Sequence, residues 1–418
     1  MRRRGVQLRI RAITVVVAGA TLAAACTDGG GSESPSTVVT TTTEVTEERV
    51  NDGVLTIGAL IPSGESGLRE ALQSSIEEAV EAVNEAGGVL GNDVRLIPAD
   101  EGETSVSASQ AIEDLVDRGV DAIVGPASSN TAIGALDEAV AAGVVTCSAT
   151  ATAIALDDFP DNELFFRSIA TDSLQAIAIA REAQATGASS VVIVHVDDAY
   201  GRPYADAVAE ALGNDIEVET IPIPVGTDDI TQDLERLATI APQVVVSIGS
   251  GADTARFLES VGRSEDFSVP TIIVNDAARS AATRPVIAAL PSTVRSRVVV
   301  IAPQIVLRQG ANAAADPPFG PQVTDCVNLL ALAAIQGDSD SPQVIAGQMS
   351  SVSDGGAVCN DFATCALRLI DDQEIDYDGP TGITDLGRDG DPSRAFFDRF
   401  RFGADGEDIF ERAFAVQA

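Results

Sequence analysis

Short apolar runs alternate with longer amphipathic segments along most of the chain, beginning at residue 54. The first run, Val54 to Ile61, consists largely of residues that favour strands. In the next segment, Arg69 to Glu85, apolar residues recur every three or four positions, and Gly87-Gly88 follows shortly after it. This spacing predicts an amphipathic helix that ends at glycine. The pattern therefore begins as a strand followed by a helix.

The same alternation repeats up to residue 301. Further strands are expected at 94–97, 122–124, 144–148, 191–196, 216–221, 244–248, 271–274 and 297–301. Helices are expected between them at 105–118, 131–142, 173–186, 204–212, 230–240 and 252–261. Short apolar strands separated by helices are typical of a parallel sheet that is covered on both faces. Because the alternation restarts after residue 165, it predicts two α/β units of similar plan.

The remainder of the chain adds a linker, two helices and a strand pair. Residues 303–320 are rich in Pro, Ala and Gly and are interpreted as a crossover or linker. Helices are expected at 323–334 and 342–352, and two strands within 395–416 are separated by a turn at Gly403 to Gly406.

Composition supports a globular protein and excludes several classes. The chain has 418 residues, 45% of them hydrophobic, which is enough for two domains with buried cores. The formal net charge is −37, and all 26 basic residues are arginine. So acidic a surface repels phosphate backbones, and no nucleic-acid partner is expected. A mean hydropathy of +0.17 with one long apolar run excludes a polytopic membrane protein.

The N-terminus has the pattern of a secretory signal. Five arginines lie among the first eleven residues, and Ala12 to Ala25 is apolar but too short to span a bilayer comfortably. Small residues directly precede Cys26, which resembles a bacterial lipobox, with Ala23 where that motif usually has Leu. We expect residues 1–25 to be a lipoprotein signal peptide and Cys26 to carry a lipid that anchors the protein to the cell membrane. An ordinary signal peptide with an incidental cysteine is the alternative.

Residues 26–53 are expected to form a flexible tether. The segment after Cys26 is rich in Gly, Ser, Thr and Glu, with four threonines in a row at Thr40 to Thr43. It offers too little apolar surface to fold alone. Such a segment would hold a folded domain away from a membrane.

Four cysteines follow the tether. An even number outside the cytosol favours two disulfide bonds, and four cysteines allow three pairings. Cys359 and Cys365 lie in one compact loop-to-helix segment, so we pair them, which leaves Cys147 with Cys326. Free buried thiols are the alternative. The spacings are not those of a C-x-x-C metal or redox site.

Open parallel sheets bind ligands at the carboxyl ends of their strands, so the loops there are candidate sites. After the strand at 122–124 come Ser128 and Ser129, where a helix begins. These hydroxyls either cap the helix or, together with its first amides, hold a carboxylate. Thr150 and Thr152 follow the next strand, and two hydroxyl-rich loops on neighbouring strands favour a binding site.

Two loops of the second unit present Tyr200 and Asp276 after the strands at 191–196 and 271–274. A carboxylate facing the ammonium group of an amino acid would explain Asp276, whereas a turn or helix cap is the alternative. The single histidine, His195, lies inside an apolar run and is interpreted as a core residue rather than a catalytic one.

Motifs for catalysis, nucleotide binding and metal binding are missing from the sequence. Without lysine there is no Walker motif, and the loop at 61–67 is not G-x-G-x-x-G. Neither H-E-x-x-H nor G-x-S-x-G occurs. We therefore expect no catalytic residue, no metal and no cofactor.

Several stretches, in this order and spacing, resemble the type I periplasmic binding proteins, specifically the branched-chain amino-acid (Leu/Ile/Val) family that serves ABC importers. They are AVEAVNEAGGVLG at 79–91, IVGPASS at 123–129, FRSIATD at 166–172, DAYG at 198–201 and YDGPTG at 377–382. The resemblance runs from about residue 54 to the C-terminus.

The resemblance implies an α/β fold of two lobes, each a parallel sheet flanked by helices, that close on a ligand about a hinge of three crossing strands. Lobe 1 is expected at 54–168 and 305–375, and lobe 2 at 169–304 and 376–418. In such proteins lobe 1 holds the carboxylate and ammonium of an amino acid, and lobe 2 adds a tyrosine and an acidic residue, more often Glu than Asp. The matching positions are Ser128 or Ser129, Thr150 and Thr152 in lobe 1, and Tyr200 and Asp276 in lobe 2.

These expectations predict an extracytoplasmic, lipid-anchored solute-binding protein that delivers an amino acid or similar small polar molecule to an ABC permease. Its mechanism would be ligand capture and hinge closure without covalent chemistry. One alternative is a ligand-sensing receptor domain that is not dedicated to transport. The other is an extracytoplasmic enzyme on a similar scaffold, which the missing motifs disfavour.

Overall fold

The computed structural model describes residues 51–62, 67–264, 270–280, 283–304, 319–382 and 385–417. The expected signal peptide, Cys26 and nearly all of the expected tether lie outside these residues, as does most of the expected linker at 303–320. No helix in the described ranges is both long enough and apolar enough to cross a membrane.

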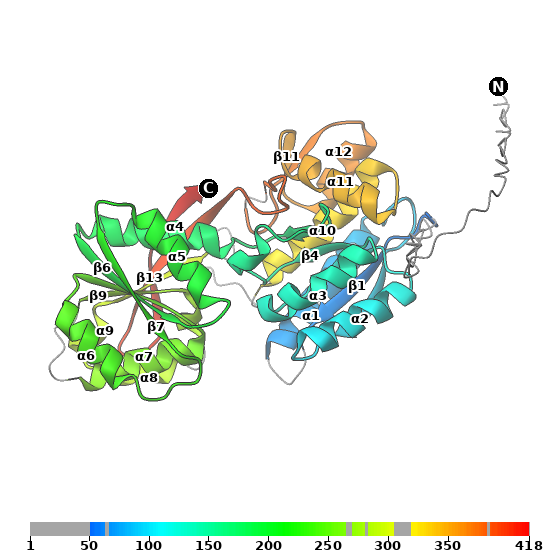
Figure 1. Ribbon diagram of the computed structural model, residues 1–418. Helices are drawn as coiled ribbons and strands as arrows, with labels where there is room; N and C mark the ends of the chain where they lie inside the picture. The colour runs from blue at the N-terminus through cyan, green and yellow to red at the C-terminus, as the bar shows by residue number, and fades with distance from the viewer. Residues whose placement is uncertain are drawn as a thin grey trace, which may run out of the picture. The chain divides into compact units, whose positions relative to one another are not determined.

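Five parallel strands form the sheet of lobe 1, of which Figure 1 labels β1 and β4. Their order is β2-β1-β3-β4-β5. All residues of β1, β3, β4 and β5 are buried, because helices cover both faces of the sheet. The strands are β1 (Thr56–Ile61), β2 (Arg95–Asp100), β3 (Ala122–Val124), β4 (Val145–Ser148) and β5 (Phe165–Arg167).

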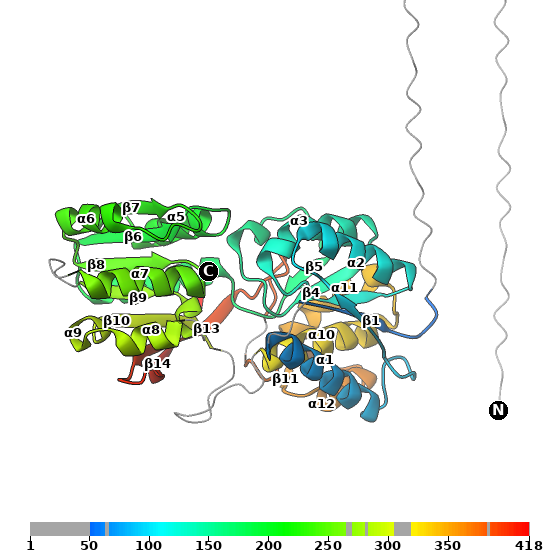
Figure 2. The same cartoon turned by 90° about the horizontal axis from the view of Figure 1, so that it is seen from below.

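Helices from distant parts of the sequence cover the two faces of this sheet (Figure 2). One face packs on α1 (Gly67–Glu85), α10 (Gly320–Gly337), α11 (Pro342–Ser353) and α12 (Phe362–Ile370). The other packs on α2 (Ser105–Asp117) and α3 (Ser129–Ala141). A small parallel pair, β11 (Ala357–Cys359) and β12 (Ile375–Tyr377), flanks α12.

Lobe 2 repeats this plan and extends it. Its parallel strands run in the order β7-β6-β8-β9-β10, which matches the order in lobe 1, and β13 and β14 continue the sheet antiparallel (Figure 2). The strands are β6 (Ser190–Val196), β7 (Glu217–Ile223), β8 (Val244–Ile248), β9 (Thr271–Val274), β10 (Val298–Pro303), β13 (Arg394–Phe402) and β14 (Asp408–Gln417).

Two groups of helices cover the sheet of lobe 2. One face packs on α4 (Asp172–Ala185) and α5 (Gly201–Leu212). The other packs on α6 (Thr231–Ile240), α7 (Gly251–Arg263), α8 (Thr283–Ala289) and α9 (Ser292–Arg295). Two single turns, η1 (Ile154–Leu156) and η2 (Asp276–Arg279), follow β4 and β9.

The expected α/β fold with two similar units is confirmed, and the differences concern short elements. Five elements of only three to seven residues were not predicted: β5, β11, β12, α8 and α9. The equally short β3 was predicted because its apolar run stands between two amphipathic segments. The residue bounds given to the two lobes stay a prediction.

Both expected disulfide bonds are present, and both lie in lobe 1. Cys147 at the end of β4 is bonded to Cys326 in α10, with a sequence separation of 179 residues. Cys359 and Cys365 close a short segment between β11 and α12, with a separation of 6. The first bond fastens the strand that leads into Thr150 and Thr152 to the helix packed on the sheet.

Candidate functional site

In lobe 1, the loops after β3 and β4 are bonded to each other. The Oγ of Ser129 accepts hydrogen bonds from the backbone amides of Thr152 (3.1 Å) and Ala153 (3.2 Å). The hydroxyl of Thr150 donates to the carbonyl of Ala127 at 2.6 Å. Ser128 lies at the N-cap position of α3 but its side chain makes no capping bond. Helix capping therefore does not explain Ser128, and the four hydroxyl residues share one small region.

A carboxylate of the protein itself lies at the start of α3. Glu101, only 1% exposed, accepts a hydrogen bond from the amide of Ala127 at 2.7 Å, and the Thr131 hydroxyl next to it donates to the carbonyl of Ser128 at 2.9 Å. Burial raises the pKa of Glu101 to about 7. The amide of Ala127 is thus occupied by Glu101. A ligand carboxylate held by the hydroxyls of Ser128 and Ser129 with the first amides of α3 stays a prediction.

The loop after β4 reaches the start of α4 in lobe 2 through Thr152. The amide of Asp172 donates to the carbonyl of Thr152 at 2.9 Å, and the nearby Thr152 hydroxyl favours the charged form of the Asp172 carboxyl, which lowers its pKa. Asp172 is 2% exposed, and its Oδ2 is buried without a hydrogen-bond partner. The sequence analysis gave Asp172 no role, because an acidic residue in the first turn of a helix is explained by the helix dipole alone.

Tyr200 and Asp276 come to the same place from the ends of β6 and β9. The amide nitrogen of Asn275 donates to the Tyr200 hydroxyl at 3.2 Å, and that of Gln175 donates to Asp276 at 3.0 Å. The ring of Tyr200 packs against the apolar cores of both lobes. The Oδ1 of Asn275 is buried without a partner, like the free oxygen of Asp172.

The electrostatics of this region are those of a buried acid, Asp172, and a half-buried acid, Asp276, without a dedicated cation. Burial raises the pKa of Asp172, and the nearby charge of Asp276 raises it further. Burial also raises the pKa of Asp276. Arg167 and Arg279 are the nearest cations that act on them, and both are bonded to other carboxylates. Carboxylate acceptors that have no cationic partner in the protein are suited to bind the ammonium group of a ligand.

A buried arginine holds the loop after β4 in place. The Arg167 side chain is 0% exposed and forms two bonds with Asp391, from Nε (2.6 Å) and from Nη2 (2.5 Å). It also bonds to Asp157 at 2.5 Å and donates to the carbonyl of Ala153 at 3.1 Å. Because Asp391 is 224 residues away along the chain, no local pattern could reveal this cluster.

Other titratable groups fit structural roles. His195 is 6% exposed, and its Nδ1 lies 2.9 Å from the carbonyl oxygen of Val196, as expected of a core residue. In the described part of the chain, one group of carboxylates is close enough to share a metal ion, with oxygens within 4.8 Å of one another: Asp376, Asp378 and Asp385. Asp385 already pairs with Arg394 at 2.9 Å, so we assign no metal to it.

Sequence comparisons connect the chain with binding proteins. A family model described as "Periplasmic binding protein" matches residues 54–290. The chemotactic signal transduction system substrate-binding protein BasB of Halobacterium salinarum is 32% identical over 349 residues, which cover 79% of this chain and 83% of BasB. Leu/Ile/Val-binding protein homolog 3 of Brucella melitensis is 28% identical over 209 residues, covering 48% of this chain and 55% of that protein.

Solved structures share the fold. The branched-chain amino-acid transporter substrate-binding protein LivJ of Streptococcus pneumoniae, in complex with isoleucine, aligns with a TM-score of 0.64 at 18% identity, covering 87% of this chain and all of LivJ. The leucine-binding protein LivK of Thermotoga maritima aligns with a TM-score of 0.65 at 18% identity, covering 86% of this chain and 98% of LivK.

Proposed function

The chain belongs to the periplasmic binding protein family, and we propose that it is an extracytoplasmic solute-binding protein. It captures an amino acid or similar small zwitterion between its lobes and delivers this ligand to an ABC permease. The observation that carries this proposal is the pair of carboxylates, buried Asp172 and half-buried Asp276, next to hydroxyl donors at the carboxyl ends of the strands.

The charges and donors of the site match the two ends of an amino acid. The free oxygen of Asp172 and the carboxylate of Asp276 would accept from the ligand ammonium, which removes the cost of unpaired buried charge. Ser129 uses only its oxygen in the bonds to Thr152 and Ala153, so its proton can be donated. The Tyr200 hydroxyl likewise accepts from Asn275 and can donate. These donors, with Ser128, would bind the ligand carboxylate.

The nature of the ligand side chain is supported by the names of relatives. The Brucella melitensis relative is called a Leu/Ile/Val-binding protein, and the Streptococcus pneumoniae structure contains isoleucine. We therefore place branched-chain amino acids first among the candidates, ahead of polar amino acids and short amides.

A thermal-shift screen with the twenty L-amino acids, glycine betaine and urea tests this proposal. A ligand at 100 times its Kd should stabilise the folded protein by roughly 2.7 kcal/mol. The site variant is Asp172→Asn, which removes a carboxylate from the site. It should lose the thermal shift that the ligand gives with the wild type. If no compound shifts the transition, or if Asp172→Asn responds like the wild type, the proposed site is wrong.

Sensing is the second candidate, because BasB, which aligns with 79% of this chain, is named for chemotactic signal transduction. In that case the closed form would be recognised by a membrane receptor instead of a permease. A strain that lacks the gene distinguishes the two functions. Loss of uptake of the radiolabelled ligand supports transport, whereas intact uptake with lost chemotaxis toward that ligand supports sensing.

Lipid anchoring through Cys26 is part of the proposal. Arginines, an apolar stretch and small residues precede this cysteine in the sequence. A single acyl chain binds membranes only weakly, so stable anchoring would need more than one. Mass spectrometry of the mature N-terminus and membrane fractionation of Cys26→Ser test this directly. A mature protein that starts at another residue and is released into the medium would contradict it.

A further inference from the structure

A basic pocket lies at the end of lobe 2 that is opposite the candidate site. It is a cavity of about 650 Å³ lined by the end of α4, the beginnings of β9 and β10, and the strands β13 and β14. Thr271 of the pocket begins β9, whereas Asp276 of the candidate site follows the end of that strand. The two regions are therefore separated by the length of β9.

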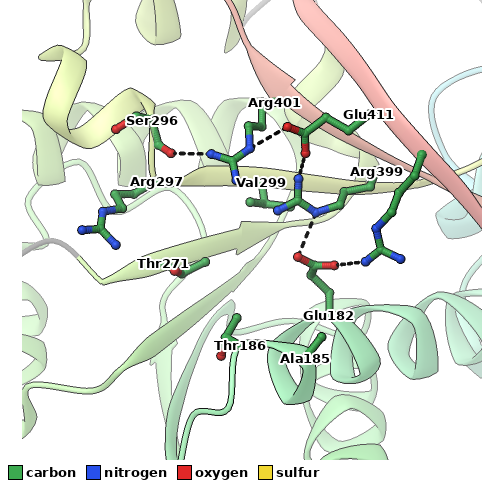
Figure 3. Close-up of a pocket in the computed structure, with 11 residues that line it drawn as sticks. Glu182, Ala185, Thr186, Thr271, Ser296, Arg297, Val299, Arg399, Arg401 and Glu411 are labelled. Carbon is green, nitrogen blue, oxygen red and sulfur yellow. Dashed lines mark hydrogen bonds and ion pairs between the residues drawn. The ribbon is translucent and has the colours of Figure 1, made fainter. Parts of the chain in front are cut away.

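Arginine outnumbers acid in this pocket, in contrast to the chain as a whole. Four arginines line it against two glutamates, Glu182 and Glu411, whereas the chain has a net charge of −37 (Figure 3). The four arginines are Arg297, Arg399, Arg401 and Arg412.

The strand register brings two of these arginines together. Arg399 in β13 is the direct partner of Arg412 in β14. Like charges directly opposite each other in a sheet are destabilising. Glu182, only 6% exposed, relieves this repulsion by bonding to Arg399 at 2.8 Å and to Arg412 at 2.7 Å, as Figure 3 shows.

Both carboxylate oxygens of each glutamate in the pocket are bonded to arginine. The two oxygens of Glu182 are taken by Arg399 and Arg412. Those of Glu411 are taken by Arg399 and by Arg401, the latter at 2.8 Å. No carboxylate oxygen of the pocket is thus left to balance further cationic charge.

Several guanidinium donors remain. Arg297 is exposed and has no bonded partner in the described ranges; Figure 3 draws its side chain beside the pocket without a contact. Arg401 uses Nε for Glu411 and Nη1 for the carbonyl of Ser296 at 3.1 Å, which leaves Nη2. Arg412 bonds Glu182 through Nη2 alone. The pocket thus offers planar donor groups from three arginines.

We propose that this pocket binds a small oxyanion with phosphate or carboxylate groups, independently of the ligand bound at the candidate site. Guanidinium groups present paired N–H donors that match the oxygens of carboxylates and phosphates and bind them bidentately. An oxyanion would also neutralise the positive charge that remains when four arginines are balanced by only two glutamates. The volume admits a small anion with its water shell.

Titration with inorganic phosphate and with citrate, at constant ionic strength set by chloride, tests this proposal. The readouts are the thermal transition and the NMR signals of arginine Nε. The pocket variant is Arg297→Gln with Arg401→Gln, because these changes leave the bonds of Glu182 intact. The matched control is Arg236→Gln with Arg263→Gln, two arginines that form exposed pairs with Glu219 and Glu259 in the same lobe.

We expect saturable binding of at least one of the two anions, at least about tenfold weaker in the pocket variant and unchanged in the control. Binding of phosphate alone, or of citrate alone, identifies which oxyanion group is preferred. The proposal is overturned if neither anion gives a saturable change, if chloride gives the same change, or if the pocket variant responds like the control. It is overturned also if the pocket variant alters only self-association, which would make this face a protein interface. None of these readouts depends on amino-acid binding.

Discussion

The two halves of the candidate site use different chemistry. The half from lobe 1 consists of hydroxyls on two loops that are bonded to each other, at Ser129 with Thr152 and at Thr150 with Ala127. The half from lobe 2 has a buried carboxylate, Asp172, and a half-buried one, Asp276, and one oxygen of Asp172 has no partner. Neutral hydrogen bonds contribute less than bonds that pair buried charges. We therefore expect lobe 2 to supply most of the binding energy and lobe 1 to supply orientation.

The halves also differ in how they are held. Both disulfide bonds lie in lobe 1, where Cys147 directly precedes the loop with Thr150 and Thr152. Glu101 fixes the start of α3 in the same lobe. In lobe 2, Asp276 is held by the side chain of Gln175 and by its neighbouring backbone amides. The rigid, neutral half from lobe 1 is suited to orient the ligand. The charged half from lobe 2 is suited to bind it.

Removal of the long-range disulfide should give the largest effect. Cys147→Ser with Cys326→Ser opens a loop of 179 residues, and the loop model predicts a loss of up to about 5 kcal/mol in the free energy of unfolding. The matched control, Cys359→Ser with Cys365→Ser, opens a separation of only 6 and should lose about 2 kcal/mol. Urea unfolding under non-reducing conditions measures both. Equal losses would contradict a special role of Cys147–Cys326 in holding lobe 1.

Removal of a carboxylate from lobe 2 should cost most in binding. Asp276→Ala and Asp172→Asn should each lower ligand affinity by about 2–5 kcal/mol, because the ligand ammonium loses a charged partner. Asp172→Asn should at the same time leave the protein at least as stable at pH 7, since burial disfavours this carboxylate in the folded state.

Calorimetry with the ligand found in the screen measures these losses. The control is Asp206→Asn, which changes an exposed residue of α5 in the same lobe and should bind normally. Unchanged affinity in both site variants would place the binding site elsewhere.

Glu101 predicts how the stability of lobe 1 depends on pH. The pKa of this carboxyl is raised from 4.5 to about 7 by burial, so the folded state favours its protonated form. Protonation of Glu101 therefore stabilises the folded state. This stabilisation is complete below pH 4.5 and is lost as the pH rises through about 7. It amounts to at most about 3 kcal/mol.

Urea unfolding at pH 5 and pH 8 tests this dependence. The stability of the wild type should fall more over this interval than that of Glu101→Gln, whose side chain does not titrate. An equal fall in both proteins would show that Glu101 is ionised at no cost, because its hydrogen bonds at the start of α3 fully offset the cost of burial, and it would contradict the raised pKa.

Thr152→Ala should have the smallest effect among the site variants. Its hydroxyl lies near the Asp172 carboxyl and favours the charged form, so loss of this neutral donor should lower the affinity by about 0.5–1.5 kcal/mol. Thr152→Ser keeps the hydroxyl and should restore most of the affinity in the same titration. A loss as large as that of Asp276→Ala would mean that lobe 1 contributes as much binding energy as lobe 2.

Most of the fold could be predicted from the sequence, because buried parallel strands appear as continuous apolar runs. The run at 191–196 and the helix after it are clear examples. Phe165–Arg167 was missed because no amphipathic helix separates it from β4, and its pairing with β4 depends on contacts between residues distant in sequence. The antiparallel direction of β13 against β10 follows from tertiary packing rather than from local pattern.

The candidate site could be predicted only in part. Strand ends and hydroxyl-rich loops led to Ser129, Thr152 and Tyr200, which the structure brings into one region. Asp172 was missed because its chemistry depends on burial, and its sequence context also fits an ordinary helix start. Arg167 and Asp391 were missed because their pairing joins segments that are far apart in the chain.

The most direct test of the central claim removes charges from the ligand instead of the protein. The best-binding amino acid is titrated by calorimetry together with its N-acetyl derivative, which lacks the ammonium, and its amide, which lacks the carboxylate. The account predicts that the N-acetyl derivative binds at least about 100-fold more weakly, because Asp172 and Asp276 lose their partner. The amide should lose less, about tenfold, because its partners are neutral hydroxyls. An N-acetyl derivative that binds as tightly as the free amino acid would contradict the account.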